Sequence, residues 1–161
     1  AEGELELMSP SPQHEDDTSD IERLLTTFSD ETGVELACAR SRTLKREETQ
    51  RGAEADTSYF VGRRRTGFPD IVIEVLWTQP LLDKLDIYWN LGIREVWLRR
   101  RSQGFSLFVR GRNGYARHRR SRLLADLDLT LLAKYVGTSS PTRAAKAYRA
   151  ALRKSLARRR N

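Results

Sequence analysis

Two carboxylic acids lie in the segment that most strongly predicts a buried strand, residues 69–76. Asp70 and Glu74 share one face of that strand with Val72 and Leu76, and a buried carboxylate is costly unless it is paired or binds a metal. At about 3.3 Å per residue the two acids lie roughly 13 Å apart, which is too far for one small cation to bridge. We therefore expect a partner for Glu74 on a neighbouring strand.

The preceding predicted strand, residues 55–61, offers Asp56 as that partner, with Glu54 just before it. Neighbouring strands lie about 4.8 Å apart. If Asp56 and Glu74 face each other, their carboxylates repel strongly unless a cation neutralises them, and oxygen ligands of this kind suit Mg²⁺ or Mn²⁺. Alternatively, each acid pairs with an arginine, and Asp70 is a strand-entry residue that accepts hydrogen bonds from turn amides.

Lys84 adds a third group, on a helix predicted over residues 80–91. It shares a face with Tyr88, at the edge of the buried stripe. Only 5 of the 29 basic residues are lysines, and a compact ammonium near the acids can orient a water or stabilise developing phosphoryl charge. The alternative is a surface lysine bonded to Asp83 or Asp86.

The charge of the chain changes along its length. Its 161 residues include 29 Lys and Arg against 22 Asp and Glu, a net charge of +7. Residues 1–40 hold 11 acids and 2 bases, residues 41–93 hold 8 of each, and residues 94–161 hold 3 acids and 19 bases. The last block, at +16, predicts affinity for phosphate backbones, although a solvated face with a disordered basic end has the same composition.

The composition also excludes several classes of protein. No run approaches the roughly 20 apolar residues of a membrane span, and no leader is visible, so we expect a cytoplasmic protein with no membrane partner. Cys38 is the single cysteine, and with only His14 and His118 as imidazoles it excludes an internal disulfide and a zinc finger. Because Cys38 lies in an apolar run, we expect a buried structural thiol.

The elements that must hold these residues follow from periodicity. Strands over residues 69–76 and 93–98 flank the helix over residues 80–91, a crossover unit that sets two parallel strands side by side. The other predicted elements are a strand over residues 2–8, a helix over 16–32, a strand over 34–39, a polar segment over 41–53, a hairpin over 105–118, a short helix over 127–135 and an amphipathic helix from 141 that frays into 158–160.

Five motifs, taken in order, resemble a known family. They are GELELMSPSP at residues 3–12 with His14, GAEAD at 52–56, PDIVIEV at 69–75, DKL at 83–85 with Tyr88, and GIREVW at 92–97. Over residues 2–136 the chain resembles the Uma-type restriction endonucleases, a branch of the PD-(D/E)xK nuclease superfamily. The resemblance implies metal-dependent hydrolysis of a phosphodiester.

The expected fold is α/β, with some α+β character. It combines a restriction-endonuclease-like mixed central β-sheet, flanked by helices, with a basic C-terminal helix. We expect two parts: an endonuclease-like domain over residues 1–137 and a basic helical extension over residues 138–161.

The resemblance also implies roles for individual residues. Asp56 would match the metal-binding aspartate, Glu74 the second acid, and Lys84 a lysine that in this branch has moved from the strand to the following helix. Leu76 stands where the superfamily pattern places lysine, so activity rests on Lys84. Asp70 is an additional candidate that competes with Asp56 only if the predicted strand pairing is wrong.

Three functional hypotheses follow. The first is a Mg²⁺- or Mn²⁺-dependent endonuclease acting on DNA, in which Asp56, Glu74 and a backbone carbonyl near Val75 hold the ion while Lys84 positions the water. The basic residues expected to hold the nucleic acid include Arg63, Arg64, Arg65, Arg119 and Arg120. The second is an inactive nuclease-fold protein that binds nucleic acid, and the third a basic module that recruits a protein partner through residues 141–160. A homodimer is left open.

Overall fold

The computed structural model describes residues 11–45, 52–76 and 82–160. The helices are α1 (Pro12–Thr32), α2 (Leu82–Asn90), α3 (Leu129–Ala133) and α4 (Pro141–Arg160). The strands are β1 (Leu36–Cys38), β2 (Thr43–Lys45), β3 (Gly52–Glu54), β4 (Thr57–Val61), β5 (Ile71–Leu76), β6 (Glu95–Arg100), β7 (Gly104–Gly111) and β8 (Gly114–His118). None of the helices in these ranges combines the length and the apolar character that a bilayer span requires.

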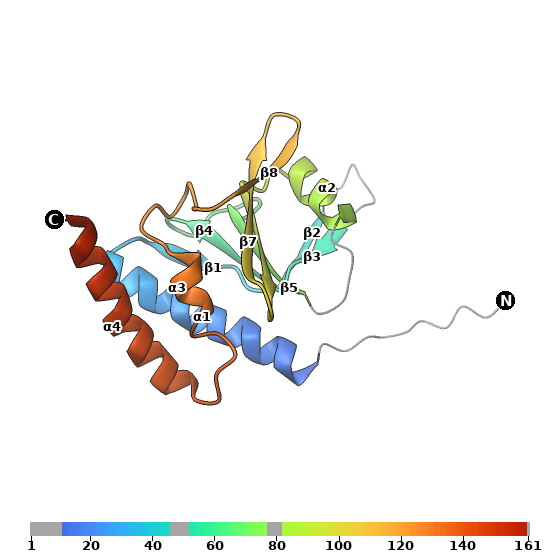
Figure 1. Cartoon of the computed structure of the whole chain (residues 1–161). Coiled ribbons are helices and arrows are strands. Elements are labelled where there is room, and N and C mark those ends of the chain that lie inside the picture. Colours follow the sequence, from blue (N-terminus) through green and yellow to red (C-terminus); the bar gives the residue numbers. More distant parts are fainter. Residues whose placement is uncertain (1–10, 46–51, 77–81, 161) are drawn as a thin grey trace.

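Strand β5 lies inside a six-stranded sheet with the order β1-β4-β5-β6-β7-β8. It runs antiparallel to β4 and parallel to β6, and α2 makes the crossover between β5 and β6. The sheet is therefore mixed and flanked by helices, which confirms the predicted fold class (Figure 1). Strands β2 and β3 form a separate antiparallel pair.

The two faces of the sheet belong to different cores. One core includes Ile73 and Trp97 together with residues of α1, α3 and α4. The other includes Val72 and Tyr88 together with residues of α2, β2 and β3. Because successive residues of a strand point to opposite faces, the side chain of Glu74 lies on the α2 side of β5 with that of Val72.

Helix α1 begins at Pro12, so the predicted start at residue 16 is wrong by four residues. The Ser11 hydroxyl accepts a hydrogen bond from the backbone N–H of His14 at 3.3 Å and caps the helix. Proline is favoured in the first turn, where its missing N–H leaves no bond unmade. The earlier start places His14 on the first turn of α1.

Two further segments differ from expectation. The polar segment over residues 41–53 contains β2 and the first two residues of β3, because Leu44 and Ala53 are buried and supply enough apolar contact to pair the two short strands. Cys38 is only partly buried, with its thiol beside Glu22 and Thr57. The predicted strand over residues 2–8 lies outside the described residues.

Helix α4 packs along α1 and shares its core. Tyr148 and Leu152 of α4 are buried in that core, and Arg149 and Arg153 both pair with Glu31 of α1. The helix continues to Arg160 where fraying was predicted, and its basic last turn is stabilised by the negative end of the helix dipole. The predicted boundary at residue 137 thus falls before a helix that completes the core.

Candidate active site

Glu74 is the most deeply buried of the three predicted catalytic residues, with 1% of its side chain exposed. Both of its carboxylate oxygens meet side chains of α2. The Tyr88 hydroxyl donates to Oε1, and the Lys84 ammonium donates to Oε2 at 3.0 Å. The acid that looks anomalous in a buried strand is therefore held between a hydroxyl and an ammonium.

Helix α2 delivers these two groups from one face. Lys84 and Tyr88 are four residues apart, so their side chains lie one above the other on the helix. Tyr88 is fully buried, whereas the Lys84 side chain is 39% exposed and its Nζ also lies 3.4 Å from the carbonyl oxygen of Glu54. Lys84 thus joins the buried carboxylate to the surface of the protein.

Asp56 lies just before β4, beside Glu74. The β4–β5 register pairs Thr57 with Ile73, and one further step along it sets Asp56 opposite Glu74. The Asp56 Oδ2 accepts a hydrogen bond from the backbone N–H of Val75 at 2.7 Å, and 21% of its side chain is exposed. The structure therefore brings Asp56, Glu74 and Lys84 together at one end of the β4–β5 pairing.

The electrostatics of Glu74 reflect this crowding. Burial, followed by the negative charge of Asp56, raises the pKa of Glu74 to about 7, although Lys84 and the Tyr88 hydroxyl oppose the shift. Burial also raises the pKa of Tyr88 far above its usual range, so its hydroxyl stays protonated and donates a hydrogen bond to Glu74. A cation beside Asp56 and Glu74 would favour the ionised form of Glu74.

His14 and Tyr88 join the site although the sequence assigned them no catalytic role. His14 Nε2 lies 3.2 Å from the Asp56 Oδ2, with 16% of the histidine side chain exposed. The first turn of α1 therefore reaches the end of the site opposite to α2. The sequence could have indicated both residues, because each belongs to a motif that carries the family resemblance.

Asp70 occupies a different place from the other candidates. Its Oδ2 accepts a hydrogen bond from the backbone N–H of Val61 at 2.8 Å, and its Oδ1 pairs with Arg65 at 2.7 Å. It is buried just before β5, four residues from Glu74, and ties the β4–β5 turn together. These contacts match the strand-entry alternative for Asp70.

The five arginines expected to hold nucleic acid differ in their surroundings. Arg65 pairs with Asp70 and lies over the ring of Phe60, at 4.8 Å from its centroid. The other four are exposed and have no ion-pair or hydrogen-bond partner among residues 11–45, 52–76 and 82–160. These four are Arg63, Arg64, Arg119 and Arg120.

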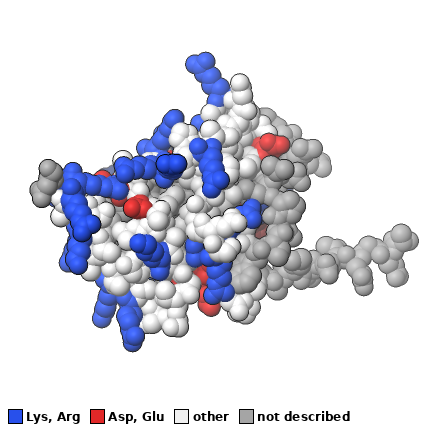
Figure 2. Space-filling view, viewed as in Figure 1, with Lys and Arg blue, Asp and Glu red and all other residues white. Residues whose placement is uncertain are grey.

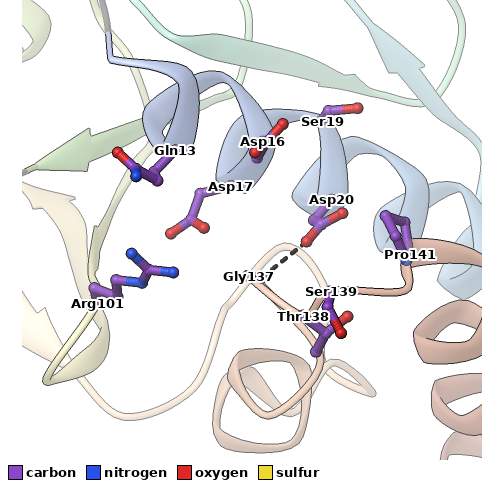
Figure 3. A pocket seen from close by; sticks show the side chains of 10 residues that line it. All are labelled: Gln13, Asp16, Asp17, Ser19, Asp20, Arg101, Gly137, Thr138, Ser139 and Pro141. Atoms are coloured by element: carbon purple, nitrogen blue, oxygen red, sulfur yellow. Dashed lines mark hydrogen bonds between the residues drawn. The ribbon is translucent and has the colours of Figure 1, made fainter.

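A second group of acids on α1 does not belong to this site. Asp17 and Asp20 line a cavity of about 320 Å³ together with Arg101 and Gly137 (Figure 3). The Asp20 Oδ2 accepts a hydrogen bond from the Gly137 N–H at 2.8 Å, and burial raises the pKa of Asp20. Asp17 lies 3.7 Å from the Arg99 Nε. Asp20 therefore ties α1 to the loop that leads into α4, whereas Asp17 lies against Arg99 of β6.

The oxygen ligands of the candidate site fit a hard cation whose other ligands are mostly waters and phosphate oxygens. In the described part of the chain, no group of three or more His, Cys, Asp or Glu side chains is placed to hold a metal ion. Asp56 and Glu74 provide two carboxylates, which is the number that Mg²⁺ commonly takes from a protein when substrate phosphates and waters complete its octahedron. Zinc, which prefers nitrogen and sulfur ligands, fits these residues less well.

A comparison with protein families matches residues 1–137 to the Uma2 model, described as "Putative restriction endonuclease". The chain belongs to the Uma2 family. A comparison with curated proteins gave no match. The Uma2 match includes β4, β5 and α2, the elements that hold the candidate site, and it ends before α4. The predicted family is therefore confirmed, and its description supports a nuclease at the level of the family.

Proposed function

We propose that this Uma2 protein is a metal-dependent endonuclease that hydrolyses phosphodiester bonds of DNA. The observation that carries the proposal is the buried Glu74 carboxylate, which lies beside Asp56 and receives the Lys84 ammonium at 3.0 Å. Two carboxylates and one ammonium, gathered where the buried Glu74 meets the partly exposed Asp56 and Lys84, would provide a cation site and a group that orients water or stabilises charge on a phosphate.

Each residue has a distinct task in this proposal. Asp56 and Glu74 would hold Mg²⁺ or Mn²⁺, and the ion, when bound, would polarise the scissile phosphate and acidify its own water. Lys84, partly exposed, would orient the attacking water or stabilise charge on the phosphate. Tyr88 fixes Glu74 from the buried side, and His14 lies against Asp56 from α1.

A second candidate function is binding of nucleic acid without cleavage. It is favoured by the fact that both oxygens of Glu74 already have protein partners, and by Leu76 at the position where the superfamily places its lysine. In this reading Lys84 neutralises Glu74 permanently and no cation enters. The two functions differ in one result, cleavage that requires a divalent metal.

The test is incubation of the purified protein with supercoiled plasmid and with short oligonucleotides, in Mg²⁺, in Mn²⁺ and in chelator. We expect cleavage only with metal, and a fall of at least about 100-fold in Glu74→Gln. Glu35→Gln, which changes an exposed glutamate outside the site, is the matched control and should retain full activity.

Three outcomes would contradict the proposal. Cleavage that persists in chelator would exclude the metal, and cleavage that Glu74→Gln leaves intact would exclude the site. Salt-sensitive binding by the wild-type protein with no cleavage in either metal would support the second candidate function.

A further inference from the structure

The exposed face of α4 carries basic side chains that neither the core nor the candidate active site uses. Of the 20 residues of α4, eight are Lys or Arg and none is Asp or Glu. Three of the eight pair with acids of other elements: Arg149 and Arg153 with Glu31, and Arg159 with Asp126. The remaining five are exposed and have no ion-pair or hydrogen-bond partner in the described ranges; they are Arg143, Lys146, Lys154, Arg158 and Arg160.

These five residues, the α4 basic face, extend along the whole helix. At 1.5 Å per residue the helix is about 30 Å long, which spans about nine base pairs of a duplex at 3.4 Å per pair. The exposed residues between the bases include Ala147, Ala150 and Ala157. Their small side chains let a phosphate backbone approach the helix closely. Figure 2 shows that Lys and Arg greatly outnumber Asp and Glu on the side of the molecule where α4 lies.

The helix is held rigidly with this face toward solvent. The Arg153 guanidinium binds Glu31 through Nε at 2.6 Å and Nη2 at 3.0 Å, and Arg149 binds the same carboxylate. On the opposite side of α4, Tyr148 and Leu152 are buried in the core. A partner would therefore meet bases on a helix that is already formed, without the entropy cost of folding it.

We propose that the α4 basic face binds the phosphate backbone of nucleic acid, independently of base sequence. Five unpaired cations on one rigid face are complementary to a regular polyanion. A membrane surface fits less well, because a helix that lies on a bilayer inserts its apolar face, and the apolar face of α4 is buried. This surface lies outside the Uma2 match and on the other side of the sheet from α2, so it is a contact separate from the candidate active site.

The test measures binding of a fluorescently labelled 30-base-pair duplex by anisotropy, in chelator and over a range of salt concentrations. The variant combines Lys146→Gln, Lys154→Gln and Arg158→Gln. If each lysine or arginine contacts one phosphate, the slope of log K against log salt should become shallower by about 2.7, and Kd at about 0.1 M salt should rise at least tenfold. Chelator prevents metal-dependent cleavage, so the result does not depend on the proposed nuclease activity.

The matched control keeps the charge at the same three positions, as Lys146→Arg, Lys154→Arg and Arg158→Lys, and should bind like the wild type. Circular dichroism melts of both triple variants check that α4 stays folded. An unchanged salt slope in the glutamine variant would overturn the proposal, and so would equal losses in both variants. Tighter binding to anionic phospholipid vesicles or to polyglutamate than to the duplex would assign the α4 basic face to a membrane or to an acidic protein instead.

Discussion

Glu74→Gln in the metal-free protein should remove a large pH dependence of the free energy of unfolding. The pKa of Glu74 is about 7 in the folded protein, against 4.5 for an unperturbed glutamate. The folded state holds this proton more tightly than the unfolded state does. The contribution of Glu74 to the free energy of unfolding is therefore largest below pH 4.5. That stabilisation is lost as the pH rises from 4.5 to about 7. At about 1.4 kcal/mol per pH unit, the loss amounts to about 3 kcal/mol.

The assay is urea unfolding of the wild type and Glu74→Gln, in chelator, at intervals from pH 4 to pH 8. Other acids with raised pKa values, such as Asp20, titrate in both proteins, so the difference between the two curves reports Glu74. The glutamine amide oxygen can still accept a bond from Tyr88 or Lys84, which limits other losses. The wild type should lose about 3 kcal/mol relative to the variant between pH 4 and pH 8. Parallel curves would refute the reasoning, because Glu74 would then ionise as an exposed glutamate does.

Three other substitutions separate catalytic from structural roles. Lys84→Met should reduce metal-dependent plasmid cleavage at least about 100-fold, and it should lower the free energy of unfolding at pH 8 by about 1 to 3 kcal/mol, because the buried Glu74 carboxylate loses the donor to its Oε2; retained cleavage would remove Lys84 from the mechanism. Tyr88→Phe should lower the free energy of unfolding at pH 8 by about 1 to 3 kcal/mol, because a buried carboxylate oxygen loses its donor, and an unchanged urea midpoint would argue against that bond. Asp70→Asn should also destabilise the protein, by about 2 to 4 kcal/mol, but the folded fraction should cleave at the wild-type rate; a folded Asp70→Asn variant that does not cleave would return Asp70 to the active site.

Local pattern was enough to predict the central unit of the fold. The apolar run of β5 and the helix and strand that follow it specify a crossover, because apolar periodicity and connection length leave few other arrangements. The same run made Glu74 conspicuous, since an acid in a buried strand requires a partner. The distance between neighbouring strands was enough to predict Asp56 as the partner of Glu74.

The rest of the site depends on tertiary approach. Tyr88 reads as one more residue of an apolar stripe until α2 is docked on β5, where its hydroxyl meets Glu74. His14 precedes Asp56 by 42 residues and reaches it only because α1 starts at Pro12. No local pattern encodes either contact.

The basic residues show the same limit. Their number predicts affinity for a polyanion, but the sequence does not indicate which of them are already paired. Arg65 is an ion-pair partner of Asp70, and Arg149 and Arg153 are partners of Glu31, because the β4–β5 turn and the α1–α4 packing bring them together. The ion pairs formed in the folded protein, rather than the total charge, therefore determine which basic side chains are left for a partner.

A crystal structure of the protein grown with Mn²⁺, with data collected at the manganese absorption edge, tests the central claim most directly. Manganese identifies itself by anomalous scattering and takes the same oxygen ligands as Mg²⁺. We predict one anomalous peak, which marks a manganese ion bound by one carboxylate oxygen of Asp56 and one of Glu74. The ion should lie at about 2.2 Å from each oxygen, with the Lys84 ammonium beside it. A Glu74 that remains bonded only to Lys84 and Tyr88, with no manganese between it and Asp56 at millimolar concentration, would contradict the account.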